Sequence, residues 1–192
     1  MKEIADSGVQ AGRIIITAGK GGGKTAAVRR IVAYLRSVGF PYTGFYAEGT
    51  WEGDMRGSFT LRCVPGGVTV PFCDRATSGW IPYGRFRYNP GAIKAGEDAV
   101  RSALPGVCIV MDEISVQELR GHVWADTLSW AVQRRENPLV LAVQRRCLGD
   151  VIAAWKLEDA VVFDGEKAPL DSQWESIARW IDGVRHTAQH LP

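Results

Sequence analysis

The sequence has no long hydrophobic run and no excess of charge of either sign, and both absences narrow its class. The longest apolar runs, such as Val107 to Met111, are far too short to span a bilayer. Residues 1–10 include Glu3 and Asp6 and lack an apolar centre, so no secretory signal is expected. The 23 basic and 21 acidic residues give a net charge of +2, which offers no electrostatic case for nucleic acid or an anionic membrane surface. We therefore expect neither nucleic acid nor membrane among the partners.

Closely spaced cysteines are also absent. Cys63, Cys73, Cys108 and Cys147 lie far apart and form no C-x-x-C pair, so neither a disulfide framework nor a zinc site is expected. Cys108 lies inside an apolar run, where cysteine acts as a small buried hydrophobe. The three histidines have no metal-ligand spacing. These features predict a cytoplasmic protein in a reducing compartment.

The rest of the composition fits one globular domain, residues 1–192, with 1–11 as a flexible N-terminal segment. Apolar periodicity predicts strands and helices that alternate along the chain. The predicted strands are 13–17, 42–47, 58–64, 68–73, 107–111, 139–143 and 160–163. The predicted helices are 24–38, 90–104, 116–134, 148–155 and 174–184. Residues 74–88, rich in Gly, Pro, Arg and aromatic residues, are predicted to be an irregular surface loop.

This alternation predicts an α/β fold. Continuous apolar strands favour a mostly parallel sheet with helices on both faces, a three-layer sandwich. The two runs on either side of Pro65-Gly66-Gly67 indicate a hairpin. That hairpin would extend the sheet in antiparallel fashion at one edge.

A glycine-rich segment follows the first predicted strand. Residues 18–25 read A-G-K-G-G-G-K-T, which matches the phosphate-loop pattern G-x-x-x-x-G-K-[ST] except that Ala18 replaces its first glycine. Glycines let backbone N–H groups turn towards an anion, and the following helix adds its positive end. Lys24 can reach the β- and γ-phosphates, and the Thr25 hydroxyl can bind Mg²⁺. The predicted nucleotide-binding residues are Gly19, Lys20, Gly21, Gly22, Gly23, Lys24, Thr25 and Ala26.

A plain glycine-rich turn between a strand and a helix is the alternative to this interpretation. The β-branched strand before the segment and the amphipathic helix after it favour the phosphate loop. Lys20 is either part of the binding set or solvated at the mouth of the loop.

Two acidic residues end the apolar run at 107–111. Asp112 would hold Mg²⁺ through a water, as a Walker B aspartate does, and so joins Thr25 as a predicted metal residue. Glu113 is then placed to accept a proton from the water that attacks the γ-phosphate. The alternative is an acidic pair capping a helix. With the upstream loop present, the catalytic interpretation is preferred, and Glu113 and Lys24 are the predicted catalytic residues.

Several motifs occur in an order that resembles one family. They are R-I-I-I-T-A-G-K-G-G-G-K-T at 13–25, G-F-Y-A-E at 44–48, Y-G-R-F at 83–86 and I-V-M-D-E-I at 109–114. Over residues 13–181 the chain resembles the small P-loop nucleoside-triphosphatases known from thermophiles (THEP type) and, in human cells, as cancer-related nucleoside-triphosphatase. The resemblance implies a P-loop NTPase domain that slowly hydrolyses several nucleoside triphosphates with Mg²⁺.

The chain departs from that family at a few positions. The family usually has glycine at Ala18, a proline within the loop, and glycine where this chain has Ser115. A threonine often follows the fourth strand of the family, where residues 142–144 read A-V-Q, and the region around 140–150 matches poorly. If that threonine senses the γ-phosphate, its absence affects turnover more than binding.

Charged residues outside these motifs are secondary candidates. Glu48 ends the second predicted strand and either positions water or metal near the phosphates or is a solvated strand-end carboxylate. Arg85 and Arg87, in the aromatic segment 74–88, are candidates to neutralise charge on the γ-phosphate. The rival arginines are Arg134, Arg135, Arg145 and Arg146.

The first hypothesis is therefore Mg²⁺-dependent hydrolysis of ATP or another nucleoside triphosphate to the diphosphate and phosphate, slow and broad in base preference. A second is a nucleotide-gated binding module that recognises a protein partner and hydrolyses little. A third is an ATP-dependent transferase, either a small-molecule kinase or a corrinoid adenosyltransferase. The K-T-A-A sequence at 24–27 favours an adenosyltransferase, whereas G-F-Y-A-E at 44–48 speaks against it.

Overall fold

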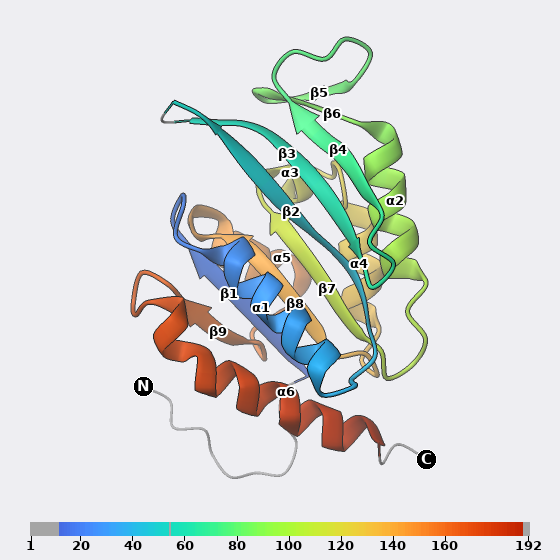
Figure 1. Cartoon of the computed structure of the whole chain (residues 1–192), viewed down its shortest axis with the longest axis vertical. Helices are drawn as coiled ribbons and strands as arrows, with labels where there is room; N and C mark the ends of the chain where they lie inside the picture. Colours follow the sequence, from blue (N-terminus) through green and yellow to red (C-terminus); the bar gives the residue numbers. More distant parts are fainter. Residues whose placement is uncertain (1–11, 54, 190–192) are drawn as a thin grey trace.

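The computed structural model describes residues 12–53 and 55–189, and these form one mixed sheet with helices on both faces (Figure 1). Residues 1–11, predicted to be a flexible segment, lie outside the described residues. The strands of the described chain are β1 (Arg13–Ala18), β2 (Tyr42–Glu52), β3 (Met55–Val64), β4 (Thr69–Asp74), β5 (Ile81–Tyr83), β6 (Phe86–Tyr88), β7 (Cys108–Ile114), β8 (Leu139–Gln144) and β9 (Val161–Asp164). The helices are α1 (Lys24–Ser37), α2 (Pro90–Arg101), α3 (Val116–Leu119), α4 (Ala125–Gln133), α5 (Leu148–Trp155) and α6 (Trp174–Gln189), with two 3₁₀ turns at Arg145–Cys147 and Leu170–Gln173.

The strand order in the sheet is β5-β6-β4-β3-β2-β7-β8-β1-β9. Neighbouring strands from β2 through β7, β8 and β1 to β9 run parallel. From β2 outwards through β3, β4 and β6 to β5, every neighbouring pair is antiparallel. The predicted α/β fold with an antiparallel edge is confirmed. The antiparallel part is larger than predicted, because β2 continues to Glu52 and pairs along β3.

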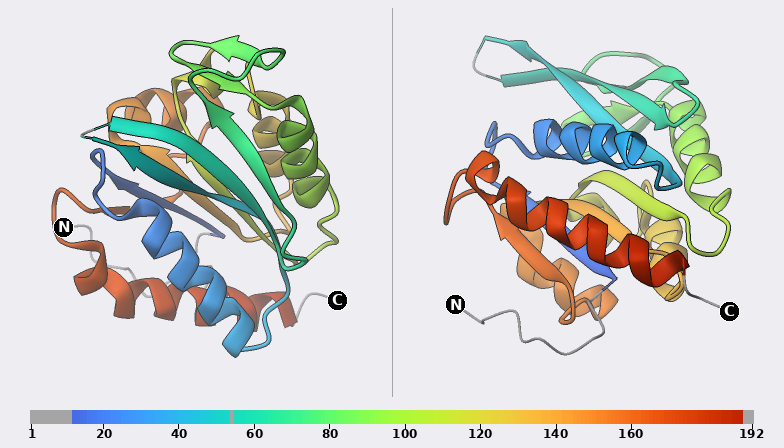
Figure 2. Two further views of the ribbon diagram at one scale, coloured as in Figure 1. Left: turned by 45° about the horizontal axis from the view of Figure 1, so that its top comes forward. Right: turned by 60° about the horizontal axis from the view of Figure 1, so that its bottom comes forward.

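Side chains of the parallel strands alternate between two cores. Ile14 and Ile16 of β1 pack with α1 and α6 on one face, and Ile15 packs with α2, α4 and α5 on the other. Figures 1 and 2 show α1 and α6 together on one side of the sheet. All three isoleucines are fully buried. Burial on both faces explains why these strands are continuous apolar runs in the sequence.

Residues 74–88 were predicted to be an irregular loop, and this is wrong for their second half. Strands β5 and β6 form a short hairpin that turns at Gly84, whose φ is 63°. The hairpin is held by aromatic contacts across the sheet, with Phe86 edge-on to Phe59 and Tyr88 edge-on to Phe72. Each strand has only three residues, too short for an alternating pattern to be recognised.

The single helix predicted at 116–134 is also wrong, because the chain forms α3 and α4 with a break between them. Gly121 and Val123 adopt positive φ in the break. Trp124 is 1% exposed, and its indole N–H donates to the Ile93 carbonyl oxygen at 3.2 Å. Burial of this indole against α2 orients the segment in a way that helical periodicity does not reveal. Helix α2 also ends at Arg101 instead of Leu104.

All four cysteines are buried and free. Burial was predicted for Cys108 alone, from the apolar run around it. Among the described residues, no helix is both long and apolar enough to cross a membrane.

Candidate phosphate-binding and catalytic site

The glycine-rich segment forms a tight loop between β1 and α1. Gly21 and Gly23 have φ of 75° and 83°, which favours glycine at both positions. A Cβ on Gly22 would lie 2.7 Å from the Ala18 Cβ, so this glycine is required by close packing. Gly23 is the N-cap residue of α1 and has no side chain that could cap the helix. The first N–H groups of α1 are therefore available to an anion.

Ala18 is compatible with this loop. Its side chain is buried and packs against Gly22 and Gly165. A Cβ on either glycine would lie within 2.9 Å of the Ala18 Cβ, so both positions leave room for the alanine. Lys24 folds over the loop, and its ammonium donates to the carbonyl oxygens of Ala18 and Gly19 at 3.1 and 3.3 Å. The loop therefore keeps its closed shape with alanine at the first position.

Thr25 and Asp112, 87 residues apart in the sequence, meet at the end of the loop. The Thr25 hydroxyl donates to Oδ2 of Asp112 at 2.9 Å. The same oxygen accepts from the Ala47 N–H at 3.2 Å, and Oδ1 accepts from the Glu113 N–H at 2.8 Å. Asp112 is fully buried, and desolvation raises its pKa, although these hydrogen bonds and the nearby Lys24 ammonium act against the rise.

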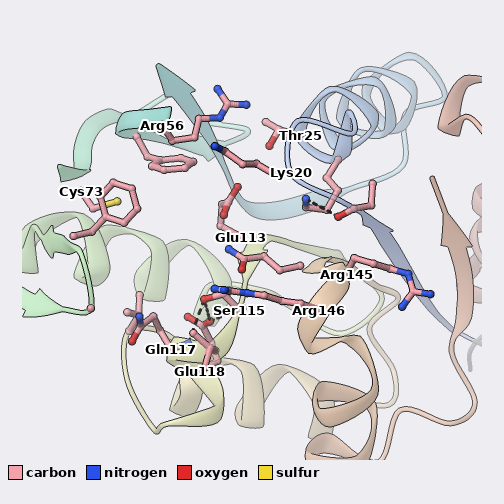
Figure 3. A pocket seen from close by; sticks show the side chains of 18 of the residues that line it. Lys20, Thr25, Arg56, Cys73, Glu113, Ser115, Gln117, Glu118, Arg145 and Arg146 are labelled. Carbon is pink, nitrogen blue, oxygen red and sulfur yellow. Dashed lines mark hydrogen bonds between the residues drawn. The ribbon is translucent and has the colours of Figure 1, made fainter. Parts of the chain in front are cut away.

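Glu113 lies where the pairing of β7 with β8 is irregular. The β7–β8 register shifts between Met111 and Ile114, and Glu113 has a φ of 62°, which is costly for a residue with a side chain. Its carboxyl group lies near the middle of the cavity in Figure 3. Desolvation, and next the neighbouring Asp112, raise its pKa to about 7, against the Lys24 ammonium and a hydrogen bond with the Gln144 side chain.

The loop and Glu113 line one large cavity of about 1170 Å³. Of the residues singled out in the sequence, this cavity collects the loop from Gly19 to Ala26, together with Glu113, Arg85, Arg145 and Arg146. Figure 3 shows Thr25, Lys20, Glu113 and Arg146 around it. Asp112 lies behind Thr25 and is not among its lining residues.

Other candidate residues lie elsewhere. Glu48 does not line the cavity; its carboxylate is paired with Arg62 at 2.5 Å and with Arg29 at 3.3 Å. Arg134 pairs with Glu136, and Arg135 with Asp159. These two arginines and Arg87 are also not among the residues that line the cavity.

Arg145 contacts two acidic side chains at and just after the end of β9. Its Nε lies 3.0 Å from Oδ2 of Asp164 and 3.7 Å from Oε2 of Glu166. The first contact is an ion pair without an aligned hydrogen bond. Arg146 lines the cavity from an exposed position next to it.

Arg56 and Gln144 are among the lining residues that were missed in the sequence. Arg56 on β3 packs its guanidinium 4.2 Å from the Trp51 ring centre, and the Trp51 ring lies 3.7 Å from where a Cβ would stand on Gly21. No local pattern marks Arg56, because only the β2–β3 pairing brings it to the loop. Gln144 could have been found, because it ends β8 beside β7, at the edge where parallel strands present site residues.

Comparisons with known proteins point to one family. A family model described as NTPase matches residues 13–177. The chain is 31% identical over 159 residues to the nucleoside-triphosphatase THEP1 of Methanothermobacter thermautotrophicus, covering 81% of this chain and 88% of that protein.

Two solved structures share the fold. They are the solution structure of a human cancer-related nucleoside triphosphatase, with a TM-score of 0.69, and the crystal structure of THEP1 from Aquifex aeolicus, with a TM-score of 0.66. Each is 20% identical, and each alignment covers 88% of this chain and 96% of the other. With the family match over most of its length, the chain belongs to the NTPase family and is an enzyme that hydrolyses nucleoside triphosphates.

Proposed function

We propose that this nucleoside-triphosphatase works with Mg²⁺, which Thr25 and Asp112 would hold, and with Glu113 as the general base. The observation that carries the proposal is the 2.9 Å hydrogen bond between the Thr25 hydroxyl and Oδ2 of Asp112. This contact brings two oxygen atoms that can act as metal ligands together beside the phosphate loop, and Mg²⁺ prefers oxygen ligands. Among the described residues no cluster of three or more His, Cys, Asp or Glu forms a metal site, which fits an ion that takes its other ligands from phosphate and water.

The bound ion would neutralise charge on the β- and γ-phosphate oxygens. The loop N–H groups and Lys24 hold the same phosphates. Glu113 takes a proton from a water molecule as its oxygen bonds to the γ-phosphorus. The bond from that phosphorus to the β–γ bridging oxygen then breaks, and the diphosphate and inorganic phosphate leave. A pKa near 7 suits this role, because a base works best when its pKa lies close to the operating pH.

The test is the Glu113→Gln variant, with Glu158→Gln on the exposed surface as a matched control. Loss of the base is expected to lower the turnover rate about 100-fold or more, while the Kd for a non-hydrolysable ATP analogue with Mg²⁺ changes little. Phosphate release and analogue binding are measured separately. Equal rates in the wild type and Glu113→Gln would overturn the assignment of the base.

We further propose that the enzyme accepts ATP and other nucleoside triphosphates and turns them over slowly. Slow turnover is supported by Val143 and Gln144, which stand where the family often has threonine. A reducing cytoplasm remains the expected compartment, in keeping with four free buried thiols. A panel of nucleoside triphosphates assayed at equal concentration tests whether the enzyme accepts several bases. Hydrolysis rates that differ more than about tenfold between bases would contradict a broad base preference.

A further inference from the structure

The cavity does not end at the phosphate loop. It continues past Glu113 into a part that we call the aromatic pocket, defined by Phe59, Cys73, Tyr83, Phe86 and Gln117. In Figure 3, Glu113 lies between the loop side, marked by Thr25, and the side marked by Cys73 and Gln117. The whole cavity, at about 1170 Å³, is larger than the roughly 300–1,000 Å³ that one small ligand usually occupies.

A triphosphate bound on the loop would leave the aromatic pocket open. Lys24 and Thr25 fix the β- and γ-phosphates, and the rest of the nucleotide continues past Ala26 along the start of α1. The γ-phosphate would face Glu113, so the nucleoside extends away from the aromatic pocket. The pocket is then a separate space on the far side of Glu113.

The walls of this pocket suit a flat ring. Phe59 and Phe86 meet edge to face with ring centres 5.6 Å apart, and Tyr83 stacks on His122 at 4.2 Å. All three pocket rings are only partly buried, so part of each remains accessible to a ligand. The Cys73 thiol adds no charge, because burial raises its pKa far above its usual value. Aromatic walls of this kind pack planar molecules by stacking or edge contacts.

Gln117 brings a side-chain amide to this pocket. Its side chain is 9% exposed and lines the cavity, and its Oε1 has no hydrogen-bond partner among the described residues. Its Nε2 lies under the β5–β6 turn, 3.4 Å from where a Cβ would stand on Gly84. Buried acceptors are nearly always satisfied, so an unsatisfied one on a side chain that lines a cavity indicates a missing donor.

We propose that the aromatic pocket binds a second small molecule, a planar heteroaromatic ring with an N–H donor, of the nucleobase type. The ring packs against Phe59, Tyr83 and Phe86, and the N–H donates to Oε1 of Gln117. The inference uses the proposed position of the triphosphate on the loop, but it does not depend on hydrolysis or on Glu113 as a base.

Adenosine is the probe, because it has a flat ring with an N–H donor and no phosphate for the loop to hold. It is titrated calorimetrically into protein saturated with Mg²⁺ and a non-hydrolysable ATP analogue. We expect saturable binding of one adenosine per chain that does not displace the analogue. Purine riboside, which lacks the exocyclic amine, is expected to bind the wild type threefold to tenfold more weakly, the loss of one hydrogen bond.

The matched variants are Gln117→Met and, outside the cavity, Gln133→Met on α4. Gln117→Met should weaken adenosine by the same factor and leave purine riboside unchanged, while Gln133→Met changes neither. The ATP-analogue Kd of each variant shows whether the loop still folds, and the comparison of the two nucleosides on wild type requires no substitution. Displacement of the analogue, no adenosine binding at millimolar concentration, or equal binding of both nucleosides would overturn the proposal. If the wild type does not bind the ATP analogue at all, the proposal that the loop holds the triphosphate is overturned instead.

Discussion

The parallel and antiparallel halves of the sheet differ in how their sequence encodes structure and in what they contribute to the site. The parallel half carries the loop after β1 and the carboxylates of β7, and its strands are short apolar runs. The antiparallel half contributes Arg56 and the aromatic rings, which come from strands with irregular burial patterns. In the proposed mechanism, the first half provides the chemistry common to phosphate loops, and the second half shapes the space around the phosphates.

The two halves join where β2 passes β7, and the largest predicted effect lies at this junction. Gly44 has a φ of 126°, and a Cβ there would lie 2.0 Å from the Val110 carbonyl oxygen. Gly44→Ala is expected to lower the free energy of unfolding by about 3 kcal/mol or more, because backbone must move and the conformation is strained. Urea denaturation followed by circular dichroism measures this.

Gly149→Ala on α5 is the matched control, since a Cβ there meets nothing within 4 Å. It should leave stability unchanged or raise it by up to about 1 kcal/mol. A Gly44→Ala protein as stable as this control would show that the two halves are not held in contact by this glycine.

Sequence reasoning located the parallel half well because its signals are local. The glycines and Lys24 of the loop are adjacent in the sequence, and Asp112 follows directly on an apolar run. The antiparallel half depends on contacts between distant residues. Arg56 reaches the loop only through the β2–β3 pairing, and the break before α4 depends on burial of Trp124 under α2. Neither contact leaves a short-range pattern in the chain.

Glu118 lines the cavity from α3. It is buried in the capping box of α3, where its Oε2 accepts from the Ser115 N–H at 2.7 Å, and desolvation raises its pKa from 4.5 to about 7. Between these two values the folded chain holds a proton that the unfolded chain releases. Its contribution to stability is therefore fully present below pH 4.5 and is lost as the pH rises through 7.

Glu118→Gln keeps an acceptor in the capping box but cannot ionise. Relative to wild type, the variant should gain on the order of 2 kcal/mol in unfolding free energy between pH 5 and pH 8. Glu158→Gln, at an exposed position, should show no such gain. Urea denaturation at both pH values measures the difference, and parallel curves for wild type and Glu118→Gln would contradict the prediction.

Arg56 tests whether the antiparallel half takes part in the chemistry. Arg56→Met keeps a long side chain against Trp51 and removes a cation from the cavity. We expect hydrolysis to fall about tenfold, because a positive group near the transferring phosphate is lost. Arg56 also lowers the pKa of Glu113, so the acid limb of the pH–rate profile should move to higher pH. Arg101→Met on α2 is the control, and equal effects of the two would confine Arg56 to a structural role.

The smallest expected effect belongs to Glu48, at the end of the G-F-Y-A-E segment. Its side chain is 30% exposed, and its carboxylate pairs with both Arg62 and Arg29, outside the residues that line the cavity. Exposed ion pairs of this kind contribute at most about 1 kcal/mol and weaken with salt. Glu48→Gln should therefore lower the unfolding free energy by less than about 1 kcal/mol, with a smaller loss in 0.5 M salt, and change the hydrolysis rate less than about threefold. Arg62→Met should give a similar loss of stability, since it removes the same pair. A fall in hydrolysis of tenfold or more with stability intact would instead assign Glu48 to the phosphates, and the antiparallel half would then supply a second acidic group to catalysis.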